Sequence, residues 1–178
     1  MTNMPINLNF NPLNLLNLIL VHSYINDEEA WIIQEDTHGP WNHAFLQREN
    51  GLAVSQNILF NEIPLNVYAK AGNILGFWSI VNLTTEEWEI INEAITADLK
   101  GPIWNRFYNF INLIGQALRQ YWISMPGQNI CSQRMAKYLR LLPRLRGIVP
   151  PDPSPVDLGN IFQANPGLFN FVGYWWQI

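Results

Sequence analysis

The sequence predicts one domain of the α+β class, with an antiparallel sheet of about five or six strands packed against helices. Three observations support this: a short apolar run near the start, an Asn-Gly pair between two apolar segments, and a helix-capping motif further along. The 178 residues suffice for one core, and a content of 48% hydrophobic and 13% charged residues is typical of a packed globule. We therefore expect 1–178 to be a single domain, with its core elements within 18–162 and an aromatic tail at 163–178.

The amino-terminal part predicts a strand and then a helix. Residues 18–24 form a short apolar run, and 26–36 begin with a cap-like Asn-Asp pair followed by a Trp-Ile-Ile group. The apolar stretch Leu13–Val21 follows no Lys or Arg and is too short to span a bilayer. It is interpreted as leading into the first strand, which favours a cytoplasmic location; an uncleaved export signal is the alternative.

The next elements are predicted to be strands. The apolar segments 41–46 and 52–60 flank Asn50-Gly51, a pair that strongly favours a β-hairpin. Two further apolar segments, 65–69 and 76–81, are predicted to add strands to the same sheet.

The second half of the chain is predicted to be mainly helical. Thr84 and Glu87 have the spacing of a capping box, which predicts a helix over 85–99. Asn129 can cap a later helix that runs to about Leu142. The aromatic-rich stretch 104–122 is predicted to be helical or partly helical, and either to be buried or to line a site. Residues 143–156 are predicted to form an extended proline-rich connection to a short segment at 156–162. The tail either docks onto the body or forms an exposed aromatic patch.

The charge pattern bears on possible partners. The net charge is −4, yet five basic side chains lie close together: Arg134, Lys137, Arg140, Arg144 and Arg146. Such a stretch can hold an anion or nucleic acid, but without a nucleic-acid motif a helix face that balances acidic neighbours is favoured. The sequence also contains no phosphate-binding glycine loop and no zinc-type Cys/His cluster.

The single cysteine, Cys131, is a candidate nucleophile. It lies in the first turn of the predicted helix, where unpaired backbone N–H groups and the helix dipole favour a thiolate. The same N–H groups can stabilise an oxyanion. The structural alternative is that Cys131 is a small core residue on an apolar helical stripe.

A thiol nucleophile needs a base, and His43 is the preferred candidate. If the hairpin turns at Asn50-Gly51 with cross-strand pairs that sum to 101, Gln56 shares the sheet face of His43 and can orient its ring. A one-residue shift would replace Gln56 with Ser55 or Asn57 on that face. His22, expected to be buried and hydrogen-bonded, is the second candidate for the base, whereas His38 is expected to be a loop residue.

Five motifs, taken in order, resemble a known family. They are Trp41-Asn42-His43-Ala44-Phe45, Val54-Ser55-Gln56-Asn57, Gly101-Pro102-Ile103-Trp104, Cys131-Ser132-Gln133-Arg134-Met135-Ala136 and Pro155-Val156-Asp157-Leu158. With His before Cys, this order is similar to that of the circularly permuted papain-like hydrolases of the NlpC type, which include the YiiX-like and lecithin:retinol acyltransferase-like proteins. The similarity covers most of the chain.

The resemblance implies a papain-like core in which the Cys131 helix packs on the sheet face that carries His43. It implies a cysteine hydrolase that cleaves amide or peptide bonds, such as those of cell-wall peptides, through an acyl-enzyme and without a metal or organic cofactor. A lipid acyltransferase or esterase and a non-catalytic binding protein are the alternatives, and membrane association is not implied. The implied catalytic residues are Cys131, His43 and Gln56, and the implied substrate-binding residues are Trp41, Ser55, Trp104 and Ser132.

Overall fold

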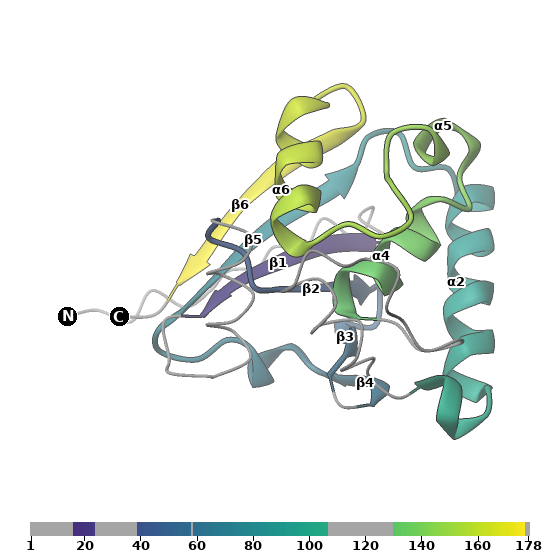
Figure 1. Cartoon of the computed structure of the whole chain (residues 1–178), viewed down its shortest axis with the longest axis horizontal. Coiled ribbons are helices and arrows are strands. Elements are labelled where there is room, and N and C mark those ends of the chain that lie inside the picture. The colour runs from purple at the N-terminus through teal and green to yellow at the C-terminus, as the bar shows by residue number, and fades with distance from the viewer. Residues whose placement is uncertain (1–15, 24–38, 58, 107–129, 177–178) are drawn as a thin grey trace.

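The computed structural model describes residues 16–23, 39–57, 59–106 and 130–176. Six strands form one sheet in the order β4-β3-β2-β1-β5-β6, and every neighbouring pair is antiparallel. This confirms the predicted α+β class and its antiparallel sheet (Figure 1). The strands are β1 (Leu16–Ser23), β2 (His43–Arg48), β3 (Leu52–Gln56), β4 (Phe60–Pro64), β5 (Asn73–Ile80) and β6 (Phe169–Trp176).

The helices lie mainly in the second half of the chain. They are η1 (Leu65–Val67), α2 (Thr85–Lys100), η2 (Ile103–Arg106), α4 (Cys131–Leu139), α5 (Pro143–Arg146) and α6 (Pro155–Ala164). The capping box predicted for α2 is present, since the Thr84 hydroxyl accepts from the Glu87 N–H at 3.1 Å and a Glu87 carboxylate oxygen accepts from the Thr84 N–H at 3.3 Å. Among the helices of the described ranges, none combines the length and apolar character needed to cross a bilayer.

Alternation along the strands gives the sheet two different faces. The helical face is covered by α2, α4 and α6, and its buried strand residues include Leu18, Leu20, Ala44, Leu46 and Trp78. Figure 1 shows α4 and α6 lying over the sheet on this side. The second face holds a smaller cluster of Ile19, Val21, Phe45, Ala53, Leu75 and Phe77, against which Leu65 and Tyr68 pack.

The β2–β3 hairpin forms where it was predicted, but its register differs by one residue. Phe45 pairs with Ser55 and Leu46 with Val54, so that cross-strand pairs sum to 100 and not to the expected 101. Gly51 adopts a φ of 79°, which a glycine reaches without strain. Because side chains alternate with period 2, the shift places Ser55 on the face of His43 and Gln56 on the opposite, helical face.

Two element predictions were wrong. Residues 65–69 do not form a strand. Leu65–Val67 is a short 3-10 helix, and Leu65 and Tyr68, three residues apart, both pack onto the second face. The proline-rich segment 143–156 is not extended throughout, because Pro143 and Pro155 each occupy the first position of a helix, where a missing N–H costs nothing. The predicted helix at 26–36 and most of the aromatic stretch at 104–122 lie outside the described residues.

The aromatic tail docks onto the body as predicted. It forms β6, an edge strand of the sheet that pairs with β5 and has an irregularity opposite Phe77 and Trp78. Several of its side chains nevertheless remain exposed, among them Phe171 and Tyr174. The strand therefore both completes the sheet and presents aromatic rings to solvent.

Candidate functional site

His43 begins β2 and lies in a cluster of polar side chains on the second face of the sheet. Its Nε2 atom is 2.9 Å from the Ser55 hydroxyl and 3.1 Å from the Tyr68 hydroxyl. These two hydroxyl oxygens are 2.5 Å apart, and Tyr68 donates to Oδ1 of Asn57 at 2.8 Å. The ring of His43 also packs beside Tyr68 and Phe45, with centroids 5.3 and 5.9 Å away. The hairpin and the turn before β5 thus build one hydrogen-bonded group.

The donors and acceptors in this group can be assigned by starting from Asn57. The Asn57 carbonyl oxygen can only accept, so the single hydroxyl proton of Tyr68 is used there. Ser55 then has its proton for the 2.5 Å contact with the Tyr68 oxygen or for the 3.4 Å contact with Asn57 Oδ1, and either choice leaves both hydroxyl oxygens as acceptors toward His43. In this arrangement Nε2 of His43 is the protonated ring nitrogen, and Nδ1 carries the lone pair. This is the tautomer in which Nδ1 can accept a proton.

The ionisation of His43 and Tyr68 follows from burial. Desolvation lowers the pKa of the partly buried His43 imidazole to about 4, so the ring is neutral at physiological pH. Burial also raises the pKa of Tyr68 to about 12, against the opposing hydrogen bonds with Ser55 and Asn57. Both groups are therefore neutral around pH 7, and the network contains no carboxylate that would stabilise an imidazolium.

Cys131 is the first residue of α4, in agreement with its predicted place at a helix start. The residue at the N-cap is Ile130, and the predicted cap Asn129 lies outside the described residues. It is 2% exposed, and it lies near enough to Tyr68 for its charge to add to the rise of the Tyr68 pKa. Since Tyr68 contacts His43 directly, the start of α4 and the start of β2 meet at the same end of the sheet. Within the described residues, however, no hydrogen bond joins the Cys131 sulfur to the His43 ring.

The relation of α4 to His43 differs from the expectation. The helix packs on the helical face through Met135, Ala136 and Leu139, whereas the ring of His43 lies with Phe45 and Tyr68 on the second face. Strand alternation is the reason, because His43 and Phe45 have the same parity and Ala44 the other. Any approach of Cys131 to His43 is thus made around the end of the sheet and not across a shared face.

Gln56 does not contact His43. Its side-chain oxygen accepts from Nε and Nη2 of Arg134 at 3.2 and 3.0 Å, and its Nε2 donates to the Arg106 carbonyl at 2.8 Å. Gln56 therefore links β3 to α4 and η2 on the helical face. The orienting position next to His43 is occupied by Ser55, which the sequence offered as an alternative after a one-residue shift.

Arg134 is the centre of a buried polar group that ties α4 to α2. Beyond Gln56, it donates to the Asp98 carboxylate at 3.0 Å, and its guanidinium lies 4.6 Å from the centre of the Phe60 ring. Burial alone would raise the pKa of Asp98, but hydrogen bonds from Lys137 and Tyr138 and the charges of Lys137 and Arg134 hold this pKa below its usual value. Asp98 is therefore ionised and holds the two helices together.

The other basic side chains of the 134–146 stretch also make internal contacts. Lys137 bonds Asp98, Arg144 donates twice to the Glu87 carboxylate at 2.9 and 2.7 Å, and Arg140 donates to the backbone carbonyls of Arg146 and Val149. The stretch thus balances acidic residues of α2, as the favoured interpretation expected, although Arg134 is buried and not solvated.

The remaining predicted site residues lie in different environments. Trp41 is buried among core rings, with Trp78 edge-on at 5.6 Å, so it is a core residue. Trp104 is 65% exposed on η2, and Ser132 is fully buried with a hydroxyl that has no partner among the described residues. His22 is partly buried and contacts the Pro40 carbonyl through Nδ1, while His38 lies outside the described residues.

Tyr68 and Asn57 complete the group around His43. Sequence reasoning placed Tyr68 in a strand and gave it no role, because its contact with His43 depends on the 3-10 turn at Leu65–Val67. A useful signal was present in the spacing: Ser55 lies twelve residues after His43, an even separation across the three-residue connection 49–51, but the register decides whether that spacing puts the two on one face.

Metal binding and similarity to known proteins give no further assignment of the site. In the described part of the chain, no group of three or more His, Cys, Asp or Glu side chains is arranged to hold a metal ion. No protein-family model matches the sequence, and no curated protein matches it either.

Proposed function

We propose that this protein is a cysteine hydrolase of amide or peptide bonds that uses Cys131 as nucleophile and His43 as base. In the first step, the thiol proton moves to Nδ1 of His43 while the sulfur attacks the substrate carbonyl carbon. His43 then returns that proton to the departing amine, which leaves an acyl-enzyme. Water, deprotonated by the same nitrogen, then attacks the acyl carbon, the bond to sulfur breaks and the carboxylic acid leaves. Nδ1 returns its proton to the sulfur, which regenerates the thiol.

The observation that carries the proposal is the hydrogen-bonded group of Ser55, Tyr68 and Asn57 at Nε2 of His43. With Nε2 donating into the Ser55, Tyr68 and Asn57 group, the basic nitrogen is Nδ1, which makes no hydrogen bond within the described residues. A Cys-His enzyme needs such a group to hold the imidazole in one tautomer and orientation. In this proposal Ser55 and Tyr68 have the positioning role first considered for Gln56.

The start of α4 supplies the second supporting observation. The first N–H groups of a helix have no partner within it, and they are suited to stabilise a negative charge on sulfur or on a carbonyl oxygen. Cys131 occupies this position, and the Ile130 N–H just before it is bonded to Gln133 at 3.1 Å. Cys131 therefore has both a helix start and a nearby imidazole network.

The neutral network suggests how the proton is transferred. Because its last acceptor is an amide oxygen and not a carboxylate, an imidazolium at His43 gains little stabilisation, consistent with its pKa of about 4. His43 is then a neutral imidazole at rest, and it acts as a general base during attack. Enzymes with a preformed thiolate–imidazolium pair differ in this respect.

The substrate class follows from the motif resemblance alone. The order His, polar residue, Cys is similar to that of permuted papain-like NlpC-type hydrolases, for which peptide or amide substrates such as cell-wall peptides come first and lipid esters second. Both classes react through the same acyl-enzyme, so a single experiment can test the two together.

The test is to trap the acyl-enzyme. The protein and its Cys131→Ala variant would be incubated with a set of peptidoglycan-derived peptides and a set of lipid esters, and intact mass would be measured after acid quenching. We expect a mass increase in the wild-type protein only, at Cys131, with released amine or alcohol. If no member of either set yields an adduct or a product, or if Cys131→Ala reacts equally well, the proposal fails.

A non-catalytic binding protein is the second candidate. One observation favours it: Cys131 is only 2% exposed. In that case the polar group around His43 stabilises the hairpin and nothing more. The test is the rate at which small electrophiles modify Cys131 in wild type and in His43→Gln. A rate that does not exceed the rate of global unfolding in either protein would support this candidate.

A further inference from the structure

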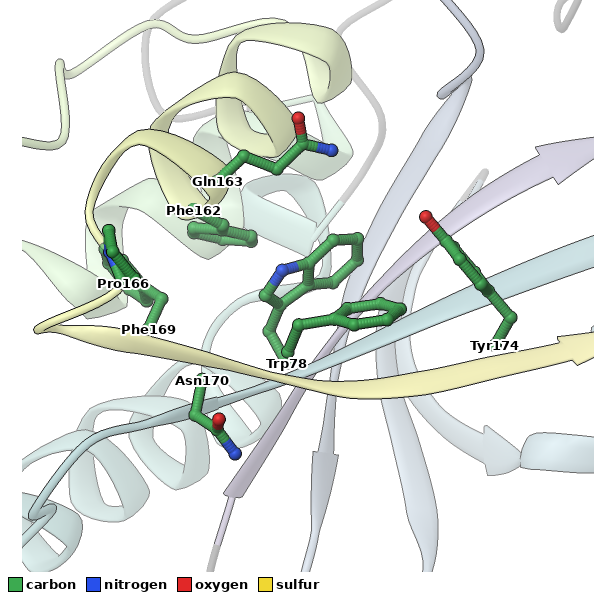
Figure 2. Close-up of a pocket in the computed structure, with 8 residues that line it drawn as sticks. Trp78, Phe162, Gln163, Pro166, Phe169, Asn170 and Tyr174 are labelled. Carbon is green, nitrogen blue, oxygen red and sulfur yellow. The ribbon is translucent and has the colours of Figure 1, made fainter.

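A cavity of about 430 Å³ lies between α6 and β6, on the helical face of the sheet. Three buried rings, those of Trp78, Phe162 and Phe169, line it together with the exposed ring of Tyr174 (Figure 2). The exposed ring of Phe171 lines it as well. The His43 network lies on the other face, so this cavity is separate from the proposed catalytic residues.

The aromatic walls of the cavity are mutually supported. The Phe162 centroid is 4.6 Å from that of Phe169 and 5.7 Å from that of Trp78, and Phe171 is 4.7 Å from Tyr174. Tyr174 is in turn stacked on Trp41, with centroids 6.4 Å apart. Packing of this kind holds the rings in place before any ligand arrives, which lowers the entropic cost of binding.

Polar groups accompany the rings at the mouth. Figure 2 shows the Gln163 carboxamide and the Tyr174 hydroxyl directed toward the same side, above Trp78. Neither side chain has a hydrogen-bond partner within the described residues, and both are exposed, so their donors and acceptors are available to a ligand. Among the described residues that line the cavity, none carries a charge.

This combination restricts the ligand. The absence of charge disfavours phosphates, carboxylates and cations, for which a site supplies opposite charge. The electron-rich ring faces attract C–H groups with a partial positive charge, and a carboxamide together with a phenol can both donate to and accept from hydroxyl groups. A sugar ring has a C–H face and a rim of hydroxyls. A purely apolar ligand would leave Gln163 and the Tyr174 hydroxyl without a role in binding.

We infer that the cavity between α6 and β6 is a binding site for a neutral saccharide, with the sugar face on the Phe171 and Tyr174 rings and its hydroxyls bonded to Gln163. The inference does not depend on the proposed hydrolase activity. The Cys131→Ala variant is expected to bind sugar like the wild type, so failure of one proposal can be told from failure of the other.

Binding can be tested with N,N′-diacetylchitobiose and cellobiose as probes. Saturation-transfer NMR on the sugar protons and the ¹⁵N shifts of the Gln163 side-chain amide and the Trp78 indole would be followed in a titration. We expect a dissociation constant on the order of 1 mM for at least one sugar, with shifts at both reporter groups. No transfer to either sugar would overturn the inference.

Matched variants locate the site. Tyr174→Ala should weaken binding by about tenfold and Gln163→Leu by about threefold, because they remove a ring contact and a hydrogen bond respectively. Val172→Ala is the control, because Val172 is 52% exposed on the same strand, as Tyr174 is at 51%, yet does not line the cavity. Equal weakening by Val172→Ala and Tyr174→Ala, or saturable binding of 1-octanol that excludes the sugars, would contradict a saccharide site.

Discussion

The two faces of the sheet differ in what their polar residues do. On the helical face, Arg134, Gln56 and Asp98 form a buried charged group that ties β3, α4 and α2 together. On the second face, the polar group around His43 is neutral throughout and joins only the hairpin and the turn after β4. The Arg134 group therefore holds the elements of the fold together, whereas the Ser55 and Tyr68 group determines the tautomer of the His43 ring.

Because of this difference, we expect substitutions on one face to affect mainly stability and substitutions on the other to affect mainly reactivity. A buried charge that loses a partner destabilises the fold strongly, whereas a neutral hydrogen bond contributes only modestly to stability. Changes on the helical face should therefore unfold the protein before they alter any chemistry. Changes around His43 should alter the tautomer and reactivity of its ring at a small cost in stability.

The largest effect is expected for Arg134→Ala. This change leaves the Gln56 side-chain oxygen without its donor and Asp98 with only Lys137 and Tyr138, and we expect it to lower the free energy of unfolding by about 3 kcal/mol. Urea denaturation followed by circular dichroism measures this. Arg140→Ala, which removes only bonds from a partly exposed guanidinium to backbone carbonyls, is the control. A loss under 1 kcal/mol for Arg134→Ala would show that the buried group is not the main link.

The second effect concerns pH. The pKa of His43 is about 4 in the folded protein and about 6.5 when unfolded, so between these values the unfolded state binds the extra proton. The contribution of neutral His43 to the free energy of unfolding is therefore fully present above pH 6.5, and roughly 2–3 kcal/mol of it is lost as the pH drops to 4. Urea midpoints of wild type and His43→Gln between pH 7 and 4 measure the slope. An identical slope in both proteins would assign it to other groups, such as Asp98.

The third effect separates function from stability on the second face. Tyr68→Phe removes the hydroxyl that contacts Ser55 and donates to Asn57. We expect this to lower the free energy of unfolding by about 1 kcal/mol. Turnover of any substrate found should fall at least about tenfold, since the His43 tautomer is no longer fixed. The ¹⁵N shifts of the His43 ring report the tautomer directly: Nε2–H in wild type and a mixture in the variant. A ring that is already Nδ1–H in wild type would contradict the assigned direction.

The smallest effect has the opposite sign. Ser132 is fully buried and its hydroxyl has no partner among the described residues, so that Ser132→Ala removes an unsatisfied polar atom. We expect the free energy of unfolding to rise by up to about 1 kcal/mol, measured by urea denaturation. A loss of stability of similar size would mean that the hydroxyl has a role in the folded state that its surroundings do not reveal.

Elements that depend on local signals could be predicted from the sequence. The capping box at Thr84 and Glu87 located the start of α2, and Asn50-Gly51 located the hairpin. The apolar run near the start located β1 to within two residues at its first end. In each case the residues that carry the signal are also the residues that make the contact.

The details of the candidate site could not be predicted, because they depend on long-range geometry. A one-residue difference in register exchanged Gln56 for Ser55 beside His43, and no local signal in the hairpin distinguishes the two registers. Tyr68 reaches His43 only because 65–67 turns instead of extending. Arg134 was assigned to an exposed basic stretch, since its buried partners lie 36 and 78 positions away in the chain.

The most direct test of the catalytic proposal is the rate at which iodoacetamide alkylates Cys131 in the native state. Rates would be compared, by intact mass, for wild type, His43→Gln and Tyr68→Phe at pH 7, with low urea concentrations added to detect labelling through global unfolding. If Cys131 and His43 act together, wild type reacts independently of low urea and His43→Gln at least about tenfold more slowly. Equal alkylation rates in wild type and His43→Gln, both rising with urea in parallel with unfolding, would contradict the catalytic proposal.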